Sequence, residues 1–230
     1  MQLPVHGFVL AGGRSLRMGQ DKAMLVFDGQ PLIERAVAKL RELCAKVSIA
    51  GNRDDLAKYA AIVQEARLQQ GPTAGVEAAL LHAQCDWIVC IPVDAPLVPA
   101  ALLRRWLEAL LQRAAAGTVA SYLRVGEQDQ PAFCAVHCSV LPQLTEALDR
   151  GDRRLLRVLQ AVAAEQERTR GLVAGAGLFV CSVESVLPRE QATAAPEWFA
   201  NLNTPEEFAA ALRRLQPDGR EHRIGVEAKL

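Results

Sequence analysis

Apolar and polar positions alternate along the first half of the chain in a way that predicts strands separated by helices. Short segments that read as strands occur at residues 6–10, 46–50, 61–63 and 87–91, and the last of them is continuously apolar, as expected of a buried parallel strand. Apolar residues at helical spacing, which indicate amphipathic helices, occupy residues 31–43, 76–83 and 99–115. Strands and helices in this alternation predict an α/β fold with a mostly parallel sheet.

The second half of the chain predicts a hairpin followed by mostly helical structure. We expect strands at 118–125, 131–137 and 177–183, a polar hairpin loop at 126–130, and helices at 141–150 and 155–164. Residues 188–196 have the composition of an exposed loop, and a capping pattern that begins at Thr204 predicts a helix to residue 215. We predict a single domain over residues 1–216 and a charged, flexible tail over residues 217–230.

The first predicted strand leads into a loop that is rich in glycine and positive charge. Residues 10–22 are Leu-Ala-Gly-Gly-Arg-Ser-Leu-Arg-Met-Gly-Gln-Asp-Lys. Glycines let a ligand approach backbone N–H groups, and Arg14, Arg17 and Lys22 add positive charge, which together suit a polyphosphate. The loop matches neither G-x-x-x-x-G-K-[ST] nor G-x-G-x-x-G, so it is neither a Walker loop nor a dinucleotide fingerprint. The alternative is a glycine turn followed by a solvated basic loop.

Further candidates follow the other predicted strands. Asn52 carries an amide that can hydrogen-bond a base, or it is a plain turn residue, and Asp54 is expected to cap the next short helix. Residues 71–75 form a loop before a helix N-terminus, which favours an anion or a base edge, or they form a simple Pro-Gly turn. Asp94 follows the fourth apolar run, where open α/β sheets bind ligands. Its carboxylate suits Mg²⁺ with substrate phosphates completing the shell, or it caps a helix.

Two polar pairs lie in the C-terminal half. Arg153 and Arg154 stand at a predicted helix start, which the helix dipole disfavours unless an anion binds there, and solvated surface arginines are the alternative. Asn201 and Asn203 lie on the same side of an extended segment, and the helix cap that begins at Thr204 explains neither of them.

Composition narrows the class of protein. Across 230 residues, 26 Lys and Arg balance 26 Asp and Glu, so no global basic field favours a nucleic-acid partner. The apolar runs are shorter than about 18 residues, and the segment before the first strand is too short for a signal peptide, so we expect a cytoplasmic protein without a membrane partner. The six cysteines form no C-x-x-C pair, which disfavours a zinc site.

The loop at residues 10–22 resembles the signature loop of the molybdenum cofactor guanylyltransferases, the MobA family of nucleoside-triphosphate transferases. Five later motifs resemble those of the family in the family's order: Gly-Pro-Thr-Ala-Gly75, Pro-Val-Asp-Ala-Pro96, Gln-Pro131, Gly-Asp-Arg-Arg154 and Asn-Leu-Asn-Thr-Pro-Glu206. The similarity spans nearly the whole chain. It implies a single Rossmann-like, three-layer α/β domain of the nucleotidyltransferase type.

This resemblance assigns the candidates to a GTP site. The residues that it places against the guanine, ribose, phosphates or metal ion are Leu10, Ala11, Gly12, Gly13, Arg17, Gly19, Lys22, Asn52, Gly71, Gly75 and Asp94. Within this set, Lys22 and Arg17 stabilise the leaving pyrophosphate and Asp94 holds Mg²⁺. The family often has an aspartate before the Gly-Pro loop, and Glu65 is the nearest residue here. Asn201, Asn203 and one of Arg153 and Arg154 match the molybdopterin side.

The reaction that the resemblance implies is transfer of GMP from GTP to the terminal phosphate of molybdopterin or its molybdenum-loaded form, with Mg²⁺ as cofactor. A phosphomonoester with a second pKa of about 6 is largely dianionic at neutral pH, so the reaction needs no general base. Gly12 favours guanine, because cytidylyl relatives typically have alanine there. Other proteins of molybdenum-cofactor synthesis and apo-molybdoenzymes are implied partners.

Other activities remain as alternatives. A nucleotidyltransferase of the same fold that uses CTP or a sugar phosphate is the nearest rival. A non-catalytic nucleotide-binding regulator is disfavoured because the chain has both Lys22 and Asp94. A nicotinamide-dependent oxidoreductase would need an acidic residue at the end of the second strand, where this chain has Gly51 and Asn52.

Overall fold

The computed structural model of the protein describes residues 1–12, 21–68, 70–199 and 205–215. In these ranges, strands of one large sheet follow the order β5-β4-β1-β6-β8-β7-β9. Its strands are β1 (Leu3–Leu10), β4 (Cys44–Ala50), β5 (Ala61–Val63), β6 (Trp87–Pro92), β7 (Ala120–Val125), β8 (Gln128–His137) and β9 (Leu178–Ser182). Only β8 runs antiparallel to its neighbours, so the predicted mostly parallel α/β sheet is confirmed.

Helices cover both faces of this sheet. The longer ones are α1 (Leu32–Leu43), α2 (Pro72–Leu81), α3 (Ala100–Ala114), α4 (Leu141–Asp149), α5 (Leu155–Arg170) and α9 (Pro205–Leu215). The short ones are the 3-10 turns η1 (Lys22–Met24), η2 (Asp54–Leu56) and η3 (Cys138–Val140), and the single-turn helices α6 (Val183–Val186), α7 (Arg189–Ala192) and α8 (Ala195–Trp198). None of the helices in the described ranges is both long and apolar enough to cross a membrane.

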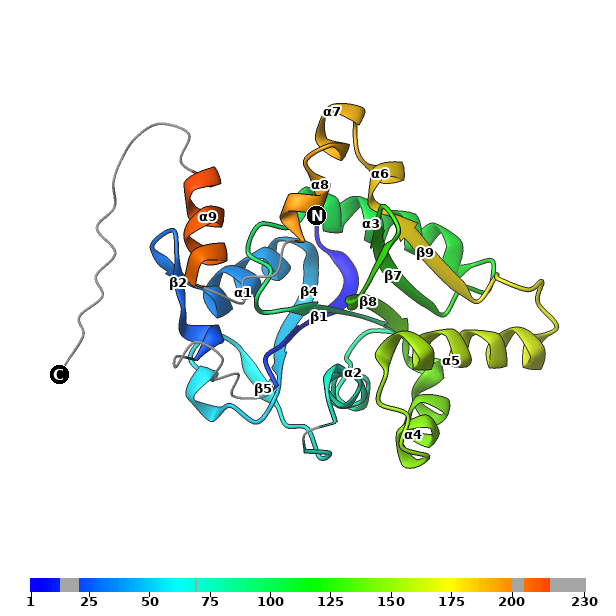
Figure 1. Cartoon of the computed structure of the whole chain (residues 1–230). Coiled ribbons are helices and arrows are strands. Elements are labelled where there is room, and N and C mark those ends of the chain that lie inside the picture. Colours follow the sequence, from blue (N-terminus) through cyan, green and yellow to red (C-terminus); the bar gives the residue numbers. More distant parts are fainter. Residues whose placement is uncertain (13–20, 69, 200–204, 216–230) are drawn as a thin grey trace.

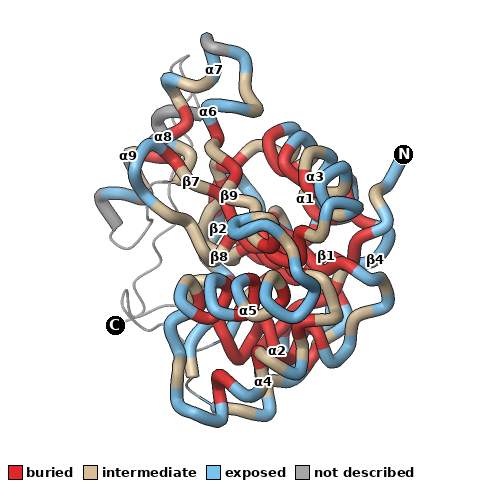
Figure 2. Tube along the Cα trace, turned by 90° about the vertical axis from the view of Figure 1, so that its right-hand side faces the viewer, coloured by how far each residue is buried: buried red, intermediate tan, exposed pale blue. Residues whose placement is uncertain are grey.

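Two apolar cores separate the layers. One packs α1 and α3 against the sheet around Leu40 and Trp106, and the other packs α2, α4 and α5 against the opposite face around Phe8 and Val158. Figure 2 shows the buried positions concentrated in the strands and on the inner sides of these helices. The predicted three-layer arrangement is therefore confirmed.

A smaller apolar cluster attaches α9 near the end of β6. The hairpin of β2 (Val26–Phe27) and β3 (Gln30–Pro31) carries Phe27, whose ring meets Phe208 of α9 edge to face at 5.3 Å. Val93 and Leu97, on either side of Asp94, pack against the same cluster. Helix α9 therefore packs against the segment that carries Asp94, beside the hairpin (Figure 1).

Several predicted element boundaries are wrong. Helix α2 begins at Pro72, not at residue 76, because proline suits the first helical turn and Gly71 adopts the positive φ of 70° that starts it. Gly71 is therefore the N-cap of a helix whose first turn is residues 72–75, and these residues are not a loop. Helix α5 continues past residue 164 to Arg170, because Glu165 pairs with Arg168 on the exposed side and Gly171 ends the helix only later.

Two further loop assignments and one cap are corrected in the same way. The hairpin turn is shorter than predicted, because β8 begins at Gln128 and accommodates Pro131 at a register shift opposite β7. The predicted loop at 188–196 contains α7 and α8, each of which starts next to a proline. Asp54 is the first residue of η2 and not its cap, a position that Arg53 occupies.

Four parallel strands end side by side at one edge of the sheet. Leu10 pairs with Ala50 on one side and with Pro92 on the other, and Ala50 pairs with Val63. The backbone pairing continues one residue further, because Gly51 N–H donates to the Val63 carbonyl over 2.9 Å. The segments that carry the candidate residues therefore leave the sheet together, at the edge where open α/β sheets bind ligands.

Candidate active site

A cavity of about 510 Å³ opens at the edge where these four strands end. Its lining residues come from the ends of β1, β4, β5 and β6, from the start of α2 and from β8. They are Leu10, Gly12, Asn52, Arg53, Glu65, Leu68, Gly71, Pro72, Gly75, Pro92 and Ala132. Six of the predicted nucleotide-site residues thus line one cavity: Leu10, Gly12, Asn52, Glu65, Gly71 and Gly75.

The carboxyl group of Glu65 lies between two glycines of this cavity. A Cβ added to Gly12 would overlap Oε1 of Glu65, and one added to Gly75 would lie 3.2 Å from the same atom and 3.0 Å from a methyl group of Leu10. Burial raises the pKa of Glu65 above its usual range. The glycines therefore make the space in which a partly desolvated carboxyl group faces the cavity.

Asn52 holds the backbone of Glu65 in place. Its Nδ2 donates to the Glu65 carbonyl over 3.0 Å, and its Oδ1 accepts from the Glu65 N–H over 2.9 Å. Gly51, one residue earlier, packs so closely on the first loop that a Cβ would lie 3.0 Å from the nitrogen of Gly12. Its φ of 147° also lies in the region that favours glycine. This turn therefore sets the distance between Glu65 and Gly12.

Lys22, at the end of the first loop, and Asp94, just after β6, form an ion pair. Lys22 Nζ lies 3.1 Å from Asp94 Oδ2, with the two side chains 12% and 32% exposed. Lys39 of α1 donates to the carbonyls of Ala95 and Pro96 over 3.4 and 3.3 Å, and so supports the segment that follows Asp94. Burial, with Arg35 nearby, lowers the pKa of Lys39 to about 8. The pair at Lys22 thus joins the exit of the first loop to the end of β6.

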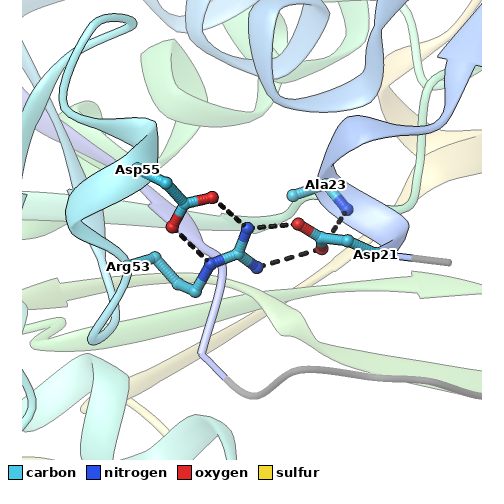
Figure 3. Close-up of polar contacts among 4 residues, drawn as sticks. All are labelled: Asp21, Ala23, Arg53 and Asp55. Atoms are coloured by element: carbon cyan, nitrogen blue, oxygen red, sulfur yellow. Dashed lines mark hydrogen bonds and ion pairs between the residues drawn. The ribbon is translucent and has the colours of Figure 1, made fainter.

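Arg53 joins the exit of β4 to the same loop (Figure 3). Its guanidinium donates to both carboxylate oxygens of Asp21 and to both of Asp55. Oδ1 of Asp21 also accepts from the N–H of Ala23 over 3.1 Å, which caps the turn that carries Lys22. Hydrogen bonds from Asp55 and Asp21 raise the pKa of Arg53, so the group stays charged.

Asp94 is the carboxylate that the sequence analysis assigns to a metal ion. In the described ranges, no group of three or more His, Cys, Asp or Glu side chains could hold a metal ion. Asp94 alone fits an ion that is shared with substrate, because Mg²⁺ in phosphate sites commonly takes one or two carboxylates and completes its shell with phosphate oxygens and water.

Comparison with known proteins agrees with this arrangement of strand ends. The model of the MobA-like NTP transferase domain matches residues 7–168 of the chain. The chain belongs to the MobA-like NTP transferase family. That match includes Gly12, Glu65, Gly75 and Asp94.

Relatives within this family extend the match toward the C-terminus. The molybdenum cofactor guanylyltransferase of Serratia proteamaculans is 35% identical over 172 residues, which cover 72% of this chain and 84% of that protein. The one of Vibrio vulnificus is 31% identical over 205 residues, 87% and 91% of the two chains. The crystal structure of molybdopterin-guanine dinucleotide biosynthesis protein A from Archaeoglobus fulgidus has the same fold, with a TM-score of 0.68, 22% identity and coverage of 93% and 100%.

The predicted arginine pair of this MobA-like chain lies beside the first turn of α2. The buried hydroxyl of Thr73 donates to the carbonyl of Arg153 over 2.9 Å, and the N–H of Arg154 donates to Asp152 over 3.2 Å. Both arginine side chains are exposed. Because Pro72 lines the cavity, this contact of the next residue places the backbone of the arginine pair near the cavity.

Some predicted residues of the MobA-like site lie outside the described residues, and these are Gly13, Arg14, Arg17, Gly19, Asn201 and Asn203. Two residues that the structure brings into the site are missing from the sequence-based set. Asp21 stands next to Lys22 in the signature loop, and Arg53 follows Asn52 at a strand end. Their positions beside predicted site residues are the signal by which the sequence could have indicated them. Neither position indicated that the two side chains pair with each other.

Proposed function

We propose that the protein transfers GMP from GTP to the terminal phosphate of molybdopterin or its molybdenum-loaded form, with release of pyrophosphate. The names of its relatives support this reaction. The observation that carries the choice of GTP is the carboxyl group of Glu65, which faces the cavity between Gly12 and Gly75.

A carboxylate at this place favours guanine over cytosine. The Watson–Crick edge of guanine presents its N1–H and N2–H₂ donors side by side, and an ionised carboxylate accepts both. Cytosine presents one donor, N4–H₂, beside acceptors at N3 and O2, so a carboxylate can accept one hydrogen bond from it and is repelled by the neighbouring acceptor. Asn52 uses both parts of its amide on the backbone of Glu65, so it supports recognition of the base by holding the residue that carries the carboxylate.

Lys22 and Asp94 form the phosphate end of the proposed site. Bound Mg²⁺ would neutralise charge that develops on the phosphates of GTP, and Asp94 is the residue that would hold it. Lys22 pairs with Asp94 in the protein without nucleotide. When the triphosphate enters, Lys22 exchanges this partner for a phosphate oxygen. Lys22 and Arg17, which lies outside the described residues, then stabilise the leaving pyrophosphate.

The acceptor needs alignment more than activation. A terminal phosphate with a second pKa of about 6 is already nucleophilic at neutral pH, so the chain's task is to hold two polyanions in line. Arg153 or Arg154, together with Asn201 and Asn203, is proposed to bind the molybdopterin side. We expect the reaction in the cytoplasm, with other proteins of cofactor synthesis and apo-molybdoenzymes as partners of the product.

The test is to incubate the protein and Mg²⁺ with molybdopterin and each of the four NTPs, and to identify the product by mass. We expect the guanine dinucleotide and pyrophosphate from GTP alone. A cytosine dinucleotide as the main product would identify a cytidylyltransferase, and GTP binding without turnover would identify a regulator. Either result would refute the proposed reaction.

A further inference from the structure

We infer that Arg53 is a positioning residue for the phosphate end of the site and acts through Asp21 on the turn that carries Lys22. This inference rests on the proposed binding of a nucleoside triphosphate. Arg53 lies 32 positions after Asp21 in the sequence, shortly after the end of β4, and it is not among the predicted site residues.

The geometry of Arg53 favours support over direct contact with a ligand. The residue is 5% exposed. Nε and Nη2 donate to Asp55 over 2.8 and 2.7 Å, Nη1 donates to Asp21 over 2.9 Å, and Nη2 also pairs with Asp21. Because a guanidinium has five N–H groups, these contacts leave it little capacity for a phosphate.

The charge of the cluster leads to the same conclusion. Arg53 with Asp21 and Asp55 carries one positive and two negative charges, so the cluster as a whole does not attract a polyanion. Removing Arg53 would leave Asp21 as an uncompensated carboxylate next to the predicted phosphate ligand Lys22. The arginine therefore both holds and neutralises Asp21.

Asp21 transmits this support to Lys22. Its carboxylate caps η1 through the N–H of Ala23, and Lys22 is the first residue of that turn. Figure 3 shows Arg53 between the two aspartates, with Asp21 bonded to Ala23 on its far side. Because Asn52 holds Glu65, two adjacent residues that follow β4 support the base end and the phosphate end of the proposed site.

The experiment measures the dissociation constants of GMP and of GTP in the presence of Mg²⁺. The constant for GMP divided by the constant for GTP gives the contribution of the two outer phosphates to binding. In Arg53→Gln we expect this ratio to fall about tenfold to a hundredfold, because a loss of that size corresponds to weakened charged hydrogen bonds to the outer phosphates. The preference for GTP over CTP should stay at the wild-type value, because Asn52 and Glu65 are unchanged.

Three variants make the result specific to the proposed contact. Asp21→Asn should lower the same ratio, and the double variant with Arg53→Gln should lose no more than Arg53→Gln alone, because both changes remove one interaction. Arg53→Lys, which keeps the charge, should lie between wild type and Arg53→Gln. Arg41→Gln is the matched control, because Arg41 bonds the carbonyl of Tyr59 over 2.6 Å on the same β4–β5 connection but lies outside the cavity lining.

An unchanged ratio in Arg53→Gln, or an equal loss for GMP and GTP, would overturn the inference. If Arg53→Gln does not fold, Asp21→Asn and Arg53→Lys decide the question with the same ratio. If the wild-type protein binds CTP as well as GTP, the proposed guanine specificity fails, while the ratio for the outer phosphates still tests Arg53.

Discussion

The two parts of the proposed site, the base end and the phosphate end, are held together by different kinds of interaction. At the base end, Gly12 and Gly75 provide space for the Glu65 side chain, and Asn52 bonds the Glu65 backbone. At the phosphate end, opposite charges are paired, with Lys22 on Asp94 and Arg53 on Asp21. The base end depends on the space around the Glu65 side chain and on whether its carboxyl group is protonated. The phosphate end depends on the balance of opposite charges.

This difference predicts how each end responds to change. The carboxylates at the phosphate end have cationic partners, so a substitution that removes a charge leaves its partner unbalanced. At the base end, the contacts that fix Glu65 come from backbone and amide groups, so added volume or a change in protonation has the larger effect. The two ends can therefore be tested separately.

The largest effect is expected at the phosphate end, in Asp94→Asn. The change keeps the shape of the side chain but removes the charge that we propose holds Mg²⁺, so GMP transfer should fall by about a thousandfold or more. Folding should be preserved, because a partly exposed ion pair contributes only about 0–1 kcal/mol. Steady-state turnover and thermal unfolding of the same preparation measure the two quantities.

The matched control for this variant is Asp28→Asn. Asp28 pairs with Arg35 over 3.6 Å, and its φ of 51° is one that asparagine tolerates. We expect wild-type turnover in that variant. Near-normal turnover in Asp94→Asn would exclude Asp94 as the metal ligand.

A smaller effect is expected at the base end, in Gly12→Ala. The new Cβ would overlap Oε1 of Glu65, and because Asn52 holds the Glu65 backbone, only the carboxyl group can move. The ratio of GTP to CTP affinity should fall by about a hundredfold at most, which corresponds to the loss of charged hydrogen bonds. Binding of pyrophosphate should not change, and a loss there would contradict the separation of the two ends.

Gly75→Ala gives a graded comparison with Gly12→Ala. Its Cβ would lie 3.2 Å from the same oxygen and 3.0 Å from Leu10, so neighbouring side chains need to shift by only a few tenths of an ångström. We expect a smaller loss of discrimination than in Gly12→Ala. The reverse order would show that Glu65 is not the group that the two glycines accommodate. Isothermal titration with GTP and CTP measures both variants.

The sequence could predict the strands and their ends because these depend on local patterns. Short, mostly apolar segments locate β1, β4, β5 and β6, and the polar residues that follow shortly after them then lie at the ligand-binding edge. This placed Asn52 and Asp94 at the edge where the structure has them. The first turn of α2 was predicted as a loop, because glycine and proline signal both turns and helix starts.

Side-chain pairings could not be predicted in the same way. Arg53 and Asp21 are 32 positions apart, and nothing in the local pattern around either residue indicates the other. The sequence offers Glu65 only as the nearest residue to the position where the family often has an aspartate, and its place between Gly12 and Gly75 is apparent only from the structure. Such contacts arise from tertiary packing, which brings together segments whose local sequences are independent.

The smallest expected effect concerns the proton on Glu65. Burial raises its pKa, so the folded protein without nucleotide binds this proton more tightly than the unfolded chain does. Guanine needs the carboxylate, so GTP affinity should fall as the pH is lowered through the raised pKa. Glu65→Gln should weaken GTP binding by about tenfold at neutral pH and remove this pH dependence, leaving CTP binding unchanged or stronger.

The raised pKa of Glu65 also predicts how the stability of the protein without nucleotide depends on pH. A raised carboxyl pKa stabilises the fold below the pKa of the unfolded chain, and this contribution is lost as the pH rises through the pKa of the folded state. Glu65→Gln should therefore unfold at a slightly higher temperature than wild type at pH 7, with a difference that narrows toward pH 4. Thermal unfolding across that range measures it. A Glu65→Gln variant that is less stable at pH 7 would show that the carboxylate has a stabilising partner, and the base end would then resemble the phosphate end.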